Sequence, residues 1–221
     1  MINVLRMEWK KLFILPRRWF MVILFFAALF LTTMRWTPWP SEPFGFLLPW
    51  LAAFAYCLAM DERCSGFSAH LRTLPGIRCH LLYAKLIINT AMAAVASLTA
   101  TLAYGFVTGA WQWQPALVLW LCEATMMWGI TGMVLLFRHR LISLIPAVAW
   151  SSGLIYGAMI HNPTAGDWLR WVIPVFPVRR MLAAATDVLP PSAWSWCGYM
   201  AAMGILSAGI GFIVDGRRAV R

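Results

Sequence analysis

The chain has 221 residues, of which 62% are hydrophobic and 12% charged, with a mean hydropathy of +0.72 and a formal net charge of +10. Soluble domains carry about 25% charged residues, so this composition excludes an ordinary soluble domain and predicts one transmembrane domain over residues 1–221. The basic residues cluster near the ends of apolar runs, which favours contact with membrane lipids rather than with nucleic acid.

Residues 1–15 predict an amphipathic interfacial helix that lies flat on the cytoplasmic membrane surface. Apolar and basic side chains alternate at helical spacing, so they fall on opposite faces. The apolar face holds Ile2, Leu5, Trp9, Leu12 and Phe13, and the basic face holds Arg6, Lys10 and Lys11. Pro16 ends this helix, because a proline inside a helix costs about 3 kcal/mol.

Six apolar runs follow and predict six transmembrane helices, giving an all-α polytopic membrane protein. They cover about residues 19–34, 44–60, 86–106, 116–137, 141–160 and 194–214. Residues 161–191 are too polar and too often broken by proline to cross, so we expect short surface or re-entrant helices on the extracytoplasmic side. Gly204, Ala208 and Gly211 in the last run predict a close helix contact.

The charge distribution predicts the orientation of these spans. With both termini in the cytoplasm, 14 Lys and Arg residues lie inside and four outside, as the positive-inside rule requires. We therefore expect a multi-pass protein of the cell membrane. None of the five cysteines falls in an external loop, so no disulfide is expected.

A polar and basic stretch from Asp61 to Lys85 separates the second and third apolar runs. It cannot lie in hydrocarbon, where a central Arg or Asp costs about 2.5–3.5 kcal/mol. We therefore expect this cytoplasmic segment to face water and to contact a soluble partner.

The order of these features resembles the ABC type-2 permease family, the membrane subunits of a class of ATP-driven exporters. That family tends to show acidic residues leaving the second span, then a glycine, a leucine-rich turn, a Leu-Pro pair and a lysine opening the third span. The matching residues are Asp61-Glu62, Gly66, Leu71, Leu74-Pro75 and Lys85, with a weaker echo in the proline-led turn Pro174-Val175-Phe176-Pro177. The resemblance implies a coupling helix near Gly66 to Pro75 that rests in a groove of the ATPase, with Asp61, Glu62, Arg63 and Arg72 also in contact.

The chain contains no GxxxxGK[ST] phosphate-binding loop, so ATP and Mg would be bound by a separate ATPase subunit, and no cofactor is expected in this chain. The resemblance implies that one six-span subunit forms half of a translocation unit, completed by a second permease chain as a homodimer or heterodimer. The expected cargo is an amphipathic or hydrophobic molecule such as a peptide, an antibiotic or a lipid-like compound. Immunity to antimicrobial peptides or drug efflux is the narrower expectation.

Glu123 is the one clear acid inside an apolar run, and an intramembrane acid is a candidate functional residue. It could bind a cationic substrate, relay protons, or be protonated and hydrogen-bonded to another helix. Two other classes stay open: an intramembrane enzyme using Glu123 or His161, and a membrane assembly protein that does not transport. No nucleophile motif such as GxSxG is present, and no metal site is expected because Cys64 with His70, and Cys79 with His80, lack paired ligand spacing.

Overall fold

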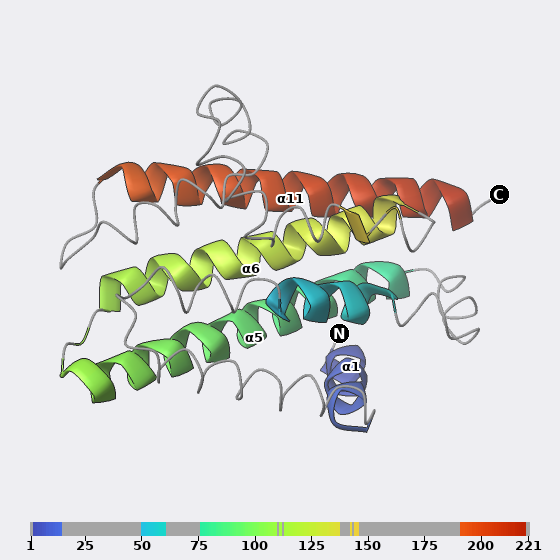
Figure 1. Ribbon diagram of the computed structural model, residues 1–221. Helices are drawn as coiled ribbons and strands as arrows, with labels where there is room; N and C mark the ends of the chain where they lie inside the picture. Colours follow the sequence, from blue (N-terminus) through green and yellow to red (C-terminus); the bar gives the residue numbers. More distant parts are fainter. Residues whose placement is uncertain are drawn as a thin grey trace.

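The structure, a computed structural model, describes residues 2–14, 50–60, 76–109, 111, 113–137, 142, 144–145 and 191–219. Its helices are α1 (Ile2–Ile14), the helix Trp50–Met60, α5 (Ile77–Thr108), α6 (Trp113–Leu136) and α11 (Pro191–Ala219) (Figure 1). No strand occurs within these ranges. The predicted all-α fold is therefore confirmed for the described part of the chain.

Three of these helices are long and apolar enough to cross a membrane. The spanning segments are Ile77–Leu102, Ala116–Leu136 and Cys197–Arg217, of which the two shorter have 21 residues. At a rise of 1.5 Å per residue such a segment is about 31 Å long, which matches a hydrocarbon core of about 30 Å. These helices correspond to the predicted third, fourth and sixth spans, and they indicate a membrane protein.

The other predicted spans are described only in part. The second appears as the shorter apolar helix Trp50–Met60. The first span, nearly all of the fifth, and the surface helices expected within 161–191 lie outside the described residues. The structure thus contains three full-length candidate spans, and the count of six stays a prediction.

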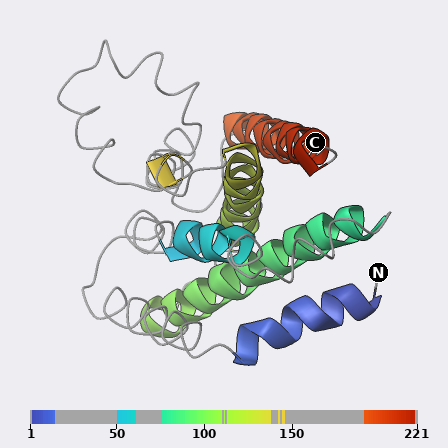
Figure 2. The same ribbon diagram turned by 90° about the vertical axis from the view of Figure 1, so that its right-hand side faces the viewer.

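The helix α6 lies between α5 and α11 (Figure 1, Figure 2). Contacts between α6 and α11 advance along both helices, from Cys122 beside Cys197 to Gly132 beside Gly211, so these two helices run parallel. Figure 1 shows α5 running in the opposite direction. The helix Trp50–Met60 contributes to the same apolar core as α5 and α6, and α1 packs against α5.

The central position of α6 explains its uniformly apolar sequence. In its spanning segment 72% of the residues are buried, against 28% in that of α11, and a helix surrounded by others has no polar face. The exposed side chains of α5 and α11 are also large and apolar, among them Val95, Leu98, Ile205 and Ile210. In a bilayer these side chains contact lipid.

The helix α5 begins at Ile77 rather than near Leu86 as the sequence predicts. Gly76 precedes it with a left-handed φ of 82°, a conformation that glycine adopts without the penalty of a Cβ. Ten residues expected to lie in the polar segment, 76–85, therefore belong to the start and first turns of this helix. Lys85 is only 2% exposed, so the expectation that the segment faces water throughout is wrong at Lys85.

The helix α1 confirms the predicted N-terminal helix and ends before Pro16. Two side chains of the predicted apolar face, Ile2 and Trp9, are exposed on the protein surface. The side chain of Glu8 is 1% exposed. Leu5 packs against the core. This arrangement fits a helix at a membrane surface, where exposed apolar side chains reach lipid and a polar one is satisfied within the protein.

Candidate functional site

The residues expected to contact an ATPase all lie outside the described residues. These are Asp61, Glu62, Arg63, Gly66, Leu71, Arg72, Leu74 and Pro75. The structure does describe the helix residues that flank them, up to Met60 on one side and from Gly76 on the other. The candidate site is therefore built from what holds these two helix ends in place.

A buried lysine joins the two flanking helices. The Lys85 Nζ donates a hydrogen bond of 2.7 Å to the carbonyl oxygen of Leu58. Leu58 belongs to the helix Trp50–Met60 and is 3% exposed, so the bond is made inside the protein. The charged group of Lys85 is thus accommodated between helices, which explains how α5 can include it.

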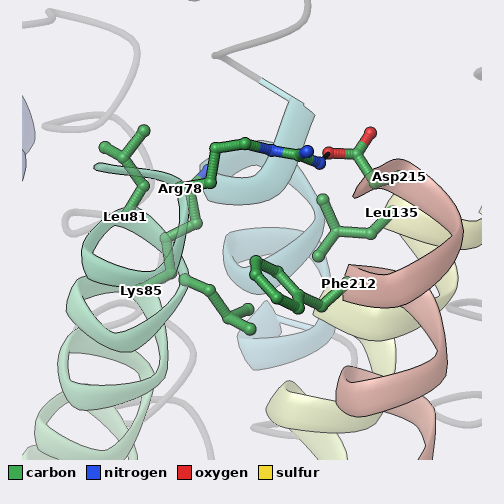
Figure 3. A pocket seen from close by; sticks show the side chains of 7 residues that line it. Arg78, Leu81, Lys85, Leu135, Phe212 and Asp215 are labelled. Carbon is green, nitrogen blue, oxygen red and sulfur yellow. Dashed lines mark hydrogen bonds and ion pairs between the residues drawn. The ribbon is translucent and has the colours of Figure 1, made fainter. Parts of the chain in front are cut away.

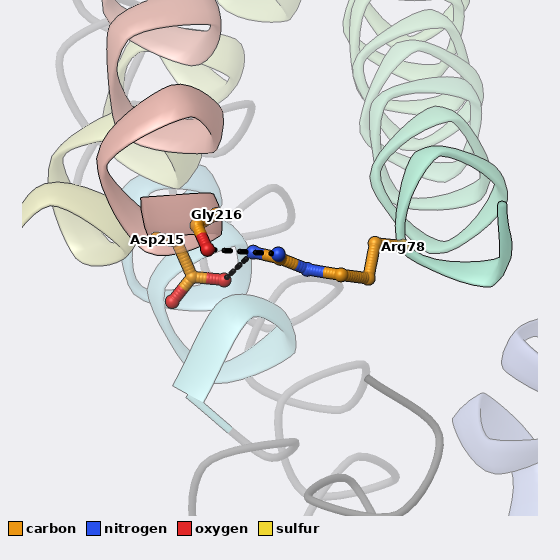
Figure 4. Close-up of polar contacts among 3 residues, drawn as sticks. All are labelled: Arg78, Asp215 and Gly216. Carbon is orange, nitrogen blue, oxygen red and sulfur yellow. Dashed lines mark hydrogen bonds and ion pairs between the residues drawn. The ribbon is translucent and has the colours of Figure 1, made fainter. Parts of the chain in front are cut away.

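An arginine in the first turn of α5 reaches the last turns of α11. The Arg78 Nη2 lies 3.1 Å from the Asp215 Oδ2, and the Nη1 donates to the carbonyl oxygen of Gly216 at 3.2 Å (Figure 4). The guanidinium also lies 5.8 Å from the centroid of the Phe212 ring, within the range of a cation–π contact. The side chains of Arg78 and Asp215 are 18% and 15% exposed, so solvent screens this ion pair only in part.

A small cavity of about 30 Å³ lies beside this ion pair. Its lining combines the charged groups with apolar side chains of α5, α6 and α11 (Figure 3), namely Arg78, Leu81, Leu82, Lys85, Leu135, Phe212 and Asp215. Since one water occupies about 10–15 Å³ on this measure, the cavity holds two or so waters and not a cargo molecule. It marks the charged end of the bundle, where α5 begins and α6 and α11 end.

The opposite end of the bundle is aromatic. Trp111, Trp113 and Trp194 are exposed there, and the rings of Trp111 and Trp113 stack with their centroids 6.1 Å apart. The sequence from Leu102 to Leu121 and from Pro191 to Met203 contains no charged residue. Tryptophan favours the boundary between hydrocarbon and water, so this end has the character of a membrane interface.

Glu123 lies in the interior of the bundle, in the third turn of α6. It is 0% exposed, and neither carboxylate oxygen has a hydrogen-bond partner among the residues that the structure describes. No three His, Cys, Asp or Glu side chains gather as metal ligands within the described ranges. The nearest titratable side chain along the helix is that of Cys122, whose Sγ lies 3.7 Å from the Cys197 Sγ of α11.

Two polar features of the site were missed in the sequence. Asn89 is 0% exposed and its Nδ2 donates to the Thr131 Oγ1 at 2.9 Å, between α5 and α6. Arg78 and Asp215 were counted only as charges at span ends, with no pairing. Their positions at the same predicted cytoplasmic side were a usable signal, because opposite charges at adjacent helix ends attract each other.

Comparisons with known protein families, characterised proteins and solved structures found no match to this chain.

Proposed function

We propose that this chain is the membrane subunit of an ABC exporter, which couples ATP hydrolysis by a separate ATPase subunit to the export of an amphipathic or hydrophobic cargo. Peptides, antibiotics and lipid-like molecules are the cargo classes that fit its apolar spans. Immunity to antimicrobial peptides or drug efflux is the role we favour. Two such chains, identical or related, form the translocation unit.

One observation carries this proposal: the polar segment 61–75 connects two helices that are tied together beside it. Lys85 bonds to the carbonyl of Leu58 and so joins the two helices, and a force applied to the segment between them reaches both. The segment itself carries the acidic pair, the glycine and the Leu-Pro pair described above. A chain without its own phosphate-binding loop needs such a surface if another protein is to drive it.

The two ends of the bundle support a cytoplasmic position for this segment. The end at which α5 begins carries Arg78, Asp215 and Arg217, whereas the other end carries exposed tryptophans and no charge in the adjoining sequence. Basic residues are retained on the cytoplasmic side of a membrane. The segment, and with it both termini, then faces the compartment that holds ATP.

The experiment that tests the proposal is purification of the full chain from its native membrane with any bound ATPase. We expect ATPase activity to co-purify, and to be lost when residues 66–75 are replaced by a Gly/Ser linker of equal length. As a control, residues 110–112 at the aromatic end are replaced in the same way, and the association should be retained. A chain that purifies stably without ATPase activity, and that is unaffected by either replacement, would contradict the proposal.

A further inference from the structure

The ion pair between Arg78 and Asp215 connects two helices that are otherwise separated. In the described bundle α6 lies between α5 and α11 along most of their length (Figure 1). Arg78 crosses from α5 directly to α11 at the charged end, without passing through α6 (Figure 4). We propose, on the basis of the function proposed above, that Arg78 is a positioning residue that transmits movement of the ATPase-contact segment to α11.

The position of Arg78 in the chain suits this role. The left-handed Gly76 lies directly before α5, and its positive φ opposes backward extension of the helix. A displacement of the segment 61–75 therefore enters α5 at its first turn. Arg78 is in that turn, two residues after Gly76.

The contacts that Arg78 makes suit an arginine in particular. Its guanidinium serves the carboxylate of Asp215 and the carbonyl of Gly216 with two different nitrogens, and lies near the ring of Phe212. A planar group with a fixed fork of donors makes these contacts together, whereas the single ammonium of lysine does not. The carbonyl and the carboxylate both lie near the C-terminus of α11, where the helix dipole also favours a cation.

The packing of α11 against α6 explains why a movement passed to α11 would reach the bundle, because Gly211 and Asp215 lie four residues apart on one face of α11. Gly204 and Gly211 lie directly against the backbone of α6, at Thr125 and Gly132. Such close backbone packing leaves little freedom for α11 to slide independently. A pull on Asp215 would accordingly move α11 together with the part of α6 that it contacts.

The test measures whether the start of α5 and the end of α11 move together. Spin labels are placed on the exposed Cys79 of α5 and on an I213C substitution of α11, with Cys57 and Cys64 changed to Ser. The distance between them is measured by pulsed electron paramagnetic resonance in lipid nanodiscs, in the complex with its co-purified ATPase, with and without ATP and vanadate. In the otherwise native chain we expect the same narrow distance distribution in both states.

Three variants decide the outcome. In Arg78→Ala the distance should change by about 1–2 Å on vanadate trapping, the size of an ordinary helix shift, while ATP hydrolysis continues. The change in Arg78→Lys should lie between those of the native chain and Arg78→Ala. The exchange Arg78→Asp with Asp215→Arg keeps the ion pair but not the bond to Gly216, so it should restore the constant distance in part. Arg217→Ala, which removes an exposed cation of the same helix end, is the matched control and should leave the distance constant.

Two different negative results are distinguishable. If an ATPase is bound but Arg78→Ala keeps the constant distance, the role of Arg78 is wrong and the proposed function stands. If no ATPase can be recovered with the native chain, the proposed function and the inference that rests on it both fail. An exchange variant that folds but does not restore the distance even in part would also contradict the inference.

Discussion

The two sides of α6 are packed in different ways. On the side of α11 the contact is made by small residues and by backbone, whereas on the side of α5 it is made by polar side chains. Within a bilayer apolar surfaces gain little by leaving lipid for protein, so helices associate through close packing and hydrogen bonds. In this molecule close backbone packing predominates on the α11 side of α6, and hydrogen bonds from side chains predominate on the α5 side.

The α11 side depends on three glycines. A Cβ added at Gly204 would lie 2.6 Å from the carbonyl oxygen of Thr125, and one added at Gly132 or Gly211 would overlap backbone of the facing helix. The Ser207 Oγ donates to the carbonyl of Gly129 at 2.9 Å. This confirms the close contact that the small residues of α11 predict, with Thr125 opposite Gly204 and Gly132 opposite Gly211.

The α5 side depends on donors that cross between helices. The Trp120 Nε1 donates to the carbonyl of Thr90 at 3.1 Å, and the Trp128 Nε1 donates to that of Leu86 at 3.2 Å. Asn89 adds the bond to Thr131. Each such bond can be lost separately, so we expect single substitutions on the α5 side to lower the free energy of unfolding by small amounts. A substitution on the α11 side should lower it by a larger amount.

The largest effect is expected for Gly132→Ala. The added methyl group would overlap the backbone at Ser207, which cannot move aside as a flexible side chain does. We expect the free energy of unfolding in mixed micelles to fall by about 1–3 kcal/mol or more, the cost of overpacking. Gly209→Ala on the exposed face of α11 is the control, because its Cβ meets nothing within 4 Å; equal effects of the two substitutions would contradict the close contact.

A change of opposite sign is expected for Glu123→Met. Neither carboxylate oxygen has a partner in the described part of the chain, so an apolar side chain of similar size removes a desolvated polar group. The free energy of unfolding should rise by about 1–3 kcal/mol, measured in the same micelles. Glu123→Gln, which keeps the polar atoms, should not show this gain. A loss of stability in Glu123→Met would show that the carboxyl group has a partner.

A smaller loss is expected for Asn89→Leu on the α5 side. The substitution removes the bond to Thr131, but it also removes the Asn89 Oδ1, which has no partner among the described residues. Interhelical hydrogen bonds in membranes contribute about 0.6 kcal/mol on average and up to about 1.7 kcal/mol, so the loss should lie within that range. Thr99→Val is the control, since that hydroxyl bonds only within its own helix. A loss as large as that of Gly132→Ala would erase the distinction between the two sides.

The parallel packing of α6 and α11 can be tested on the native chain, with no expected loss of stability. The Sγ atoms of Cys122 and Cys197 are 3.7 Å apart in the core, and a disulfide needs about 2.05 Å, so a modest approach suffices. Oxidation by copper phenanthroline should remove one hydrogen from each thiol and transfer two electrons to the oxidant. Intact-mass measurement should show the loss of two hydrogens, and Cys122→Ser should abolish it. Persistence of both free thiols would place these helices in a different register.

The sequence predicted α6 most closely among the helices of this bundle. The fourth span, expected at 116–137, is found at Trp113–Leu136. The start of α5 was placed too late because Arg78 and Lys85 were assumed to need water. Their partners, Asp215 and the carbonyl of Leu58, belong to other helices, and the sequence does not state which helix ends meet.

The candidate site was predictable to a lesser degree. The acid at position 123 is recognisable from one sequence, because charge within an apolar run is rare. Its lack of a hydrogen-bond partner depends on the neighbouring helices and cannot be read from the run itself. Asn89 was overlooked for a related reason, since a lone neutral amide scarcely alters the hydropathy of a long apolar segment.

The parallel course of α6 and α11 has a consequence for the path of the chain. The chain leaves α6 at the charged end, at Phe137, and enters α11 at the aromatic end, at Pro191. With these helices across a bilayer, the two ends of that connection lie in different compartments, and it must pass from one to the other an odd number of times. Reporter enzymes fused after Phe137 and before Pro191 would therefore give opposite readings.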